Sequence, residues 1–125
     1  MTTRHRYRDA LIRELQDLVR HAEELLDWYV TRKKSRDITE HVLFENKAVL
    51  ENEKVCLENF KRELERVDPD DYATLDDMIE DIKARFKRLV RACGYVRCAY
   101  LFAEHKIDKV RERLLADTSV HRKAG

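Results

Sequence analysis

Apolar residues recur at alternating steps of three and four along most of this chain, a spacing that aligns them on one side of an α-helix. The longest such run crosses the C-terminal half without a skipped step: Tyr72, Leu75, Ile79, Ile82, Phe86, Leu89, Cys93, Val96, Tyr100, Ala103, Ile107, Val110 and Leu114. Only two glycines and one proline interrupt the 125 residues, and 41% of the residues are charged. This composition is typical of long helices and predicts an all-α protein.

Three helices account for the pattern. We expect the first over residues 5–34, where one stripe contains Leu11, Leu15, Leu18, Ala22, Leu25 and Tyr29. We expect the second over residues 38–67, with Asp37 as its N-cap. In this segment Leu43, Leu50, Leu57 and Leu64 recur every seven residues, as they do in a helix packed along a seam. The third is expected over residues 69–117.

Two positions decide how the third helix begins and continues. Asp68 suits an N-cap and Pro69 suits the first helical position. The apolar register passes through Gly94 undisturbed, so we expect one continuous helix, at a local cost of about 1 kcal/mol for the glycine. A break at Gly94, which would give a four-helix bundle, is the alternative.

The expected fold is an antiparallel three-helix bundle with an extended, coiled-coil-like third helix, since short connections make consecutive helices antiparallel neighbours. We expect a single helical bundle domain over residues 1–117, followed by a frayed tail over residues 118–125. In helix number and length this arrangement resembles spectrin-type and other adaptor bundles.

The third helix would outlast the other two by about 15 residues, or roughly 20–25 Å. Its excess still has an apolar stripe, and water-exposed apolar patches of this kind are avoided in monomers. A second copy of the chain is the expected cover, through a two-fold contact. The sequence therefore predicts a homodimer that self-associates through Tyr100, Ala103, Ile107, Val110 and Leu114.

Charge is distributed unevenly along the chain. Residues 1–36, 37–81 and 82–125 have balances of +3, −10 and +8, which together give the net charge of +1. In the expected bundle, the turn after the first helix would lie near the end of the third, forming a basic pole. This pole would consist of Arg32, Lys33, Lys34, Arg36, Lys106, Lys109, Arg111 and Arg113. An acidic protein surface or the phosphates of nucleic acid would suit it.

The three cysteines and the N-terminus bear on location. An odd cysteine count without an apolar leader segment favours reduced thiols in an intracellular, cytoplasmic protein. No window approaches the roughly 18 apolar residues that a membrane span needs, so no membrane partner is expected.

Histidines and acids offer only isolated pairs. His21 with Glu24, His41 with Glu45 and His105 with Asp108 could each share a helix face. A metal site inside a bundle needs ligands from several helices at one level, which these pairs do not supply. We therefore expect neither a metal nor another cofactor.

The segment "RDITEH" contains three residues that are found together in a nuclease family. Arg36, Asp37 and His41 resemble the signature of helical HEPN-type ribonucleases, over six of the 125 residues. The resemblance implies that His41 would act as an acid or base and that Arg36 would stabilise phosphate charge. A capped helix start after a basic turn explains the same residues, so a HEPN-like ribonuclease is a remote alternative.

No glycine-rich phosphate loop or nucleophilic constellation is present, and no small-molecule substrate is evident. The sequence therefore predicts a protein without catalytic activity, a protein–protein interaction or assembly module that meets an acidic partner with its basic pole. A nucleic-acid-binding subunit that uses the same pole is the alternative.

Overall fold

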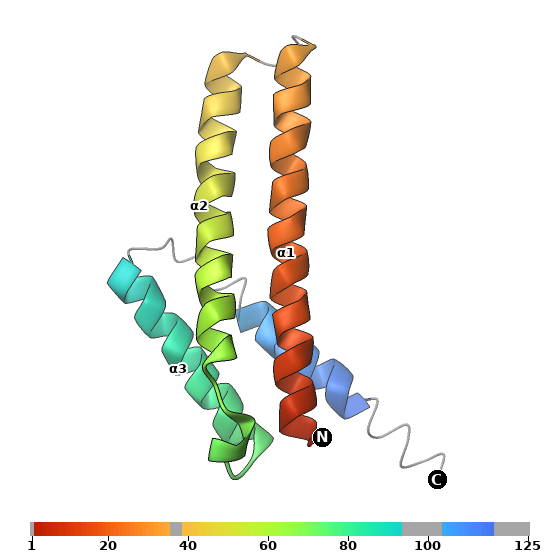
Figure 1. Cartoon of the computed structure of the whole chain (residues 1–125), viewed down its shortest axis with the longest axis vertical. Coiled ribbons are helices and arrows are strands. Elements are labelled where there is room, and N and C mark those ends of the chain that lie inside the picture. The colour runs from red at the N-terminus through yellow and green to blue at the C-terminus, as the bar shows by residue number, and fades with distance from the viewer. Residues whose placement is uncertain (1, 36–38, 94–103, 117–125) are drawn as a thin grey trace.

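The computed structural model describes residues 2–35, 39–93 and 104–116, and its ordered elements are helical throughout this part of the chain. The elements are α1 (Thr3–Lys34), α2 (Glu40–Glu65), a short 3-10 helix η1 (Pro69–Asp71), α3 (Leu75–Cys93) and a further helical stretch over residues 104–116. Figure 1 shows α1 and α2 side by side as a hairpin, with α3 and residues 104–116 lying across its lower half. The all-α prediction is confirmed.

α1 forms where the three-four stripe predicted it. Tyr7, Leu11, Leu15 and Ala22 are buried along one side, and the Thr2 hydroxyl caps the helix by accepting from the His5 backbone N–H. Three basic residues occupy the last turn, where cations are favoured by the negative end of the helix dipole.

α2 packs along α1 through the predicted seven-residue register, which buries Leu57 and Leu64 together with Cys56 and Phe60. The N-cap is Thr39, whose hydroxyl accepts from the Val42 backbone N–H at 3.2 Å. The predicted cap, Asp37, lies outside the described residues.

The third helix begins later than predicted. Asp68 caps η1, accepting from the Asp70 backbone N–H, and Pro69 opens that short turn. A second cap then starts α3, because the Thr74 hydroxyl accepts from the Asp77 backbone N–H at 3.1 Å. Two separate capping residues therefore place the helix start at Leu75, where the sequence had predicted residue 69.

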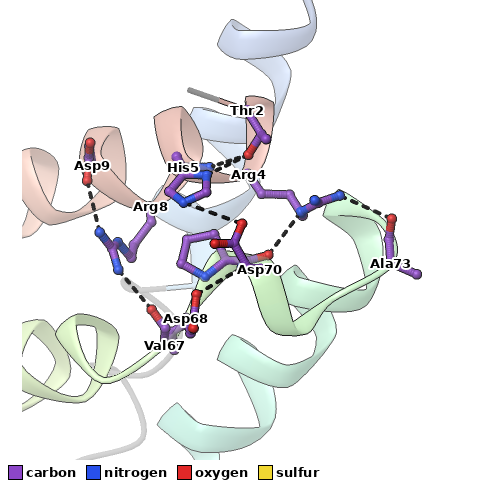
Figure 2. Close-up of polar contacts among 10 residues, drawn as sticks. Thr2, Arg4, His5, Arg8, Asp9, Val67, Asp68, Asp70 and Ala73 are labelled. Atoms are coloured by element: carbon purple, nitrogen blue, oxygen red, sulfur yellow. Dashed lines mark hydrogen bonds and ion pairs between the residues drawn. The ribbon is translucent and has the colours of Figure 1, made fainter.

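The beginning of α1 clamps the link between α2 and α3 (Figure 2). Arg4 donates to the carbonyl oxygens of Pro69 and Ala73, at 3.0 and 3.1 Å. Arg8 donates to the Val67 carbonyl at 3.0 Å. These bonds supply donors to carbonyls beyond the end of a helix, which would otherwise lack them. The base of the bundle is thereby fixed to α1.

The prediction of one continuous helix over residues 69–117 is wrong. Arg111 Nε lies 2.9 Å from Asp76 Oδ1, and Lys83 Nζ lies 3.1 Å from Asp108 Oδ1. In one straight helix the first pair would be separated by 35 steps of 1.5 Å, or about 52 Å. The chain therefore reverses, and residues 104–116 run antiparallel to α3. Gly94, where the alternative prediction placed the break, lies outside the described residues.

The reversal buries the described part of the stripe that was predicted to bind a second copy. Ile107, Val110 and Leu114 belong to the same buried cluster as Tyr7 and Leu11 of α1. The Tyr7 hydroxyl donates to the Ile107 carbonyl at 2.9 Å inside this core, and burial raises the pKa of Tyr7. These three side chains are thus covered within one chain, which removes the predicted reason for dimerisation through them. Tyr100 and Ala103 lie outside the described residues.

Replacing Phe60 with alanine is expected to lower the free energy of unfolding by about 3–5 kcal/mol. Its ring is 0% exposed and stacks on Phe86 with the ring centres 4.5 Å apart. Phe44→Ala is the matched control, the same substitution on α2 at a side chain that is 74% exposed, and should change that free energy by less than about 0.5 kcal/mol. Urea unfolding followed by circular dichroism measures both. Equal losses would contradict the assignment of Phe60 to the core.

Candidate interaction surface

The α1–α2 hairpin extends beyond the helices that cover its base (Figure 1). Nearly all of the large exposed apolar side chains in the described chain lie on this extension. Among the described residues, Leu115 is the only large exposed apolar side chain outside the extension. Those on the extension are Trp28, Val30, Val42, Phe44, Val49 and Val55. The extension is therefore the part of the described surface where apolar groups gather.

One stripe of α2 shows where the helices packed on the base of the hairpin stop covering it. Val42, Val49, Cys56 and Glu63 follow one another at steps of seven, so they lie on one side of the helix. Glu63 accepts from Arg85 of α3 at 2.9 Å. This side therefore faces α3 and residues 104–116, which together form a second layer of helices on the hairpin. Cys56 is 1% exposed, whereas Val49 is 66% and Val42 37% exposed. The cover thus stops between Cys56 and Val49.

A stripe of α1 behaves in the same way. Glu14, His21 and Trp28 are also spaced by seven, and Glu14 pairs with Lys106 and Arg113 of the folded-back stretch. Beyond that contact His21 is exposed and Trp28 is 47% exposed. Both helices therefore turn an uncovered side in the direction of the second layer. We call Trp28, Val42 and Val49 the distal face.

Trp28 is held in place by its neighbours on α1. The Arg32 guanidinium lies over the indole ring, 4.9 Å from the ring centre, and the Tyr29 ring packs edge-on at 5.0 Å. A cation over an indole face is attracted by the negative face of the ring. The distal face therefore presents an oriented indole beside a fixed positive charge.

The structure does not assemble the predicted basic pole. Arg32, Lys33 and Lys34 lie in the last turn of α1, at the tip of the hairpin. Arg113, from the other half of the set, binds Glu14, eighteen residues before Arg32 on the same helix and so about 27 Å away. The two halves lie at opposite parts of the bundle because residues 104–116 fold back to the base. Arg36 lies outside the described residues.

Most cations of the folded-back half are already paired. Lys106 and Arg113 hold Glu14, with nitrogen–oxygen distances of 3.4 and 2.6 Å, and Arg111 holds Asp76. Lys109 is exposed. Lys106 and Arg113 thus hold residues 104–116 onto α1, and Arg111 holds them onto α3.

Contacts with neighbouring side chains lower the pKa of two acids. The hydrogen bond from Arg113 holds the pKa of Glu14 below its ordinary value, and Lys106 acts in the same direction. Hydrogen bonds from Tyr72 and then Arg85 likewise lower the pKa of Asp81. Glu14 thus joins α1 to residues 104–116, and Asp81 joins α3 to the link before it, so both ionised carboxylates link the stability of the bundle to pH.

A groove of about 520 Å³ lies between α1 and residues 104–116. Its floor is apolar, and its rim mixes arginines with acids of similar number. The lining residues are Arg6, Asp9, Ala10, Arg13, Glu14, Asp17, Val110, Arg113 and Leu114. Since Glu14 and Arg113 already bind each other, the groove shows no set of polar groups converging on a ligand.

The other predicted chemistry gains no support from the geometry. His41 is largely exposed and pairs with Glu45 at 3.1 Å, while Arg36 and Asp37 lie outside the described residues. Among the residues that the structure describes, no group of three His, Cys, Asp or Glu side chains could hold a metal ion. In the same residues, no helix combines the length and apolar character needed to cross a lipid bilayer.

Sequence reasoning missed the distal face, although the sequence held a signal for it. The pairing of two helices needs only the narrow seam of Leu43, Leu50 and Leu57. Val42 and Val49 lie beside that seam and widen the apolar stripe beyond what α1 can cover.

Comparison of the sequence with protein-family models finds no match, and neither does comparison with curated proteins or with solved structures. The function must therefore be inferred from the residues of this chain.

Replacing Glu14 with glutamine should destabilise the bundle at neutral pH and have little effect in acid. The folded pKa of Glu14 is lowered, so its contribution is present above the unfolded pKa of about 4.3 and is lost as pH falls through the folded value. The difference in unfolding free energy between wild type and Glu14→Gln should shrink below about pH 4. Glu24→Gln, at an exposed position on α1, is the control. A wild-type–Glu14→Gln difference that stays constant from neutral to acid pH would refute the linkage.

Proposed function

We propose that this chain is a non-catalytic protein–protein interaction module that docks an amphipathic helix of a partner protein on the distal face. One observation supports this most strongly. On both α1 and α2 the stripe that contacts a second layer at the base continues, uncovered and apolar, at Trp28, Val42 and Val49. A helix laid there would extend the second layer along the hairpin.

The physical gain comes from apolar burial. Fully burying a valine-sized side chain stabilises a contact by about 1.5–3 kcal/mol. Tryptophan is among the residues that most often dominate binding energy at interfaces. An amphipathic helix that lays its apolar side into a groove between helices is a recurring mode of recognition. The distal face offers the two valines of α2 and the indole of α1 for such a contact.

Charge near the face favours an acidic partner. Arg32 lies over Trp28, and Lys34 is exposed at the end of α1. Lys33 lies 3.0 Å from Glu40, so it is partly occupied in closing the hairpin. The expectation of an acidic partner therefore rests on the tip of the hairpin alone, and a partner helix with Asp or Glu at that end fits it best.

Trp28 provides a direct test, because it is the only tryptophan in the chain. A displayed library of tryptophan-free amphipathic helical peptides is selected against the full chain. The proposal expects enrichment of peptides with an apolar stripe and acidic neighbours. When an enriched peptide is titrated into the protein, the emission of Trp28 should move to shorter wavelength as its indole leaves water.

Val49→Glu should weaken peptide binding at least tenfold, which corresponds to about 1.4 kcal/mol, because it places a charge in the apolar contact. Val55→Glu is the matched control, the same substitution on α2 at an exposed valine. Val55 is six residues after Val49 and so about 120° away from it around the helix. Trp28 fluorescence titrations of both variants measure the effect.

Two results would overturn the proposal. Peptides that bind Val49→Glu and Val55→Glu equally well would place the contact elsewhere. Binding of duplex DNA that falls steeply with salt, together with no enriched peptide, would favour the nucleic-acid alternative.

A further inference from the structure

The outer side of α3 has an unusual charge order. Ile82 and Phe86 are buried, so the opposite side of the helix is fixed toward solvent. On that side Asp77 and Glu80 come first, an exposed alanine follows, and Arg88 and Arg91 come last. We call Asp77, Glu80, Ala84, Arg88 and Arg91 the outer face of α3.

The outer face is symmetric about Ala84. Glu80 and Arg88 each lie four residues from it, and Asp77 and Arg91 each lie seven residues from it, with opposite signs on the two sides. Steps of four and seven remain on one side of an α-helix. A second α3 laid antiparallel with its own Ala84 at the same point would therefore meet an acid with a base at each of these positions.

Contacts within the chain do not account for this order. Glu80 and Arg88 are about 12 Å apart along the helix, too far to pair with each other. The nearest members of the set have the same sign, since Asp77 lies three residues before Glu80 and Arg88 three before Arg91. Like charges at that spacing destabilise a helix.

The helix dipole explains only part of the order. It favours acids in the first turn of α3 and bases in the last turn, and its influence falls off within that turn. Asp77 and Arg91 lie in those turns. Glu80 and Arg88 lie further inside, where the dipole gives little reason for their signs.

Other charged residues of α3 are engaged by neighbouring helices. Lys83 pairs with Asp108, and Arg85 pairs with Glu63 of α2 and with Asp81. In contrast, no hydrogen bond or ion pair joins the side chains of the four charged residues of the outer face to another residue that the structure describes. Arg88 only helps to lower the pKa of Asp81 through its charge. Within the described part of the chain, the four side chains therefore remain open to a contact with another molecule.

We propose that two copies of this chain associate through the outer faces of α3, antiparallel and related by a two-fold axis at Ala84. Such a contact is isologous, so Glu80 of each copy meets Arg88 of the other, and Asp77 meets Arg91. The small side chain of Ala84 allows the helix axes to approach within the 8–10 Å usual for packed helices.

This dimer differs from the one predicted from sequence, which used a stripe whose described members, Ile107, Val110 and Leu114, are buried. It also uses a different surface from the distal face, so it does not depend on the proposed function. Exposed ion pairs are individually weak and are screened by salt, so the association is expected to be reversible and to weaken at high ionic strength.

Sedimentation velocity over a concentration series at low salt tests the contact with four proteins. These are the wild type, Glu80→Lys, Arg88→Glu and the double swap that combines both substitutions. The wild type should associate, and each single variant should associate at least tenfold more weakly, because it places like charges opposite each other. An equimolar mixture of the single variants should associate again, since the lysine introduced in one chain would then face the glutamate introduced in the other. The double swap should also associate.

Glu24→Lys controls for net charge, because it changes the charge by the same amount as Glu80→Lys at an exposed position on α1. It should associate as the wild type does, and circular dichroism should show that every variant keeps its helix content.

A wild type that stays monomeric at every concentration would overturn the proposal, and so would a mixture no more associated than its separate components. Association that persists unchanged in both single variants would place the dimer contact on another surface. Val49→Glu should leave association unchanged while it weakens peptide binding. The two proposals can therefore fail separately.

Discussion

The lengths of the helices decide most of what this molecule presents to solvent. α1 has 32 residues and α2 has 26, whereas α3 has 19. At 1.5 Å per residue, α1 is about 48 Å long and α3 about 28 Å. Because the link before α3 is clamped to the first turns of α1, the shorter layer is aligned with the base of the hairpin. The part of the hairpin that the described second layer leaves uncovered is therefore its other end, where Trp28 and Val49 lie.

Charges at the base help to specify which surfaces of the helices meet. The segment over residues 37–81 is strongly acidic and the segment after it strongly basic, and the reversal of the chain brings the two together at Asp76 with Arg111. A second pair, Lys83 with Asp108, joins two parts of the basic segment. Exposed pairs of this kind contribute only about 0–1 kcal/mol each. Burial of Ile107 and Val110 therefore contributes more to the stability of the contact between α1 and residues 104–116. The pairs instead specify which surfaces meet. Part of the uneven charge along the sequence is thus used inside the fold.

The sequence predicts the helices well and their direction poorly, for a definite physical reason. A three-four stripe records that Ile107, Val110 and Leu114 need an apolar neighbour, and it is the same whether the neighbour is a second copy or α1 of the same chain. The start of α3 was missed because Asp68 and Thr74 are both good caps, and only the structure shows that a short turn separates them.

The two proposed surfaces differ in how far the sequence reveals them. The charge order of α3 can be read directly, because Glu80, Ala84 and Arg88 are local in the chain and only their exposure had to be learned. The distal face could not be read in that way. Val49 and Cys56 occupy equivalent places on one stripe, yet one is exposed and the other buried, and the difference depends on where a distant segment stops covering α2. An apolar stripe that is wider than a two-helix seam needs therefore indicates a second layer of helices. Where that second layer is shorter than the stripe, the uncovered part of the stripe is the surface left for a partner.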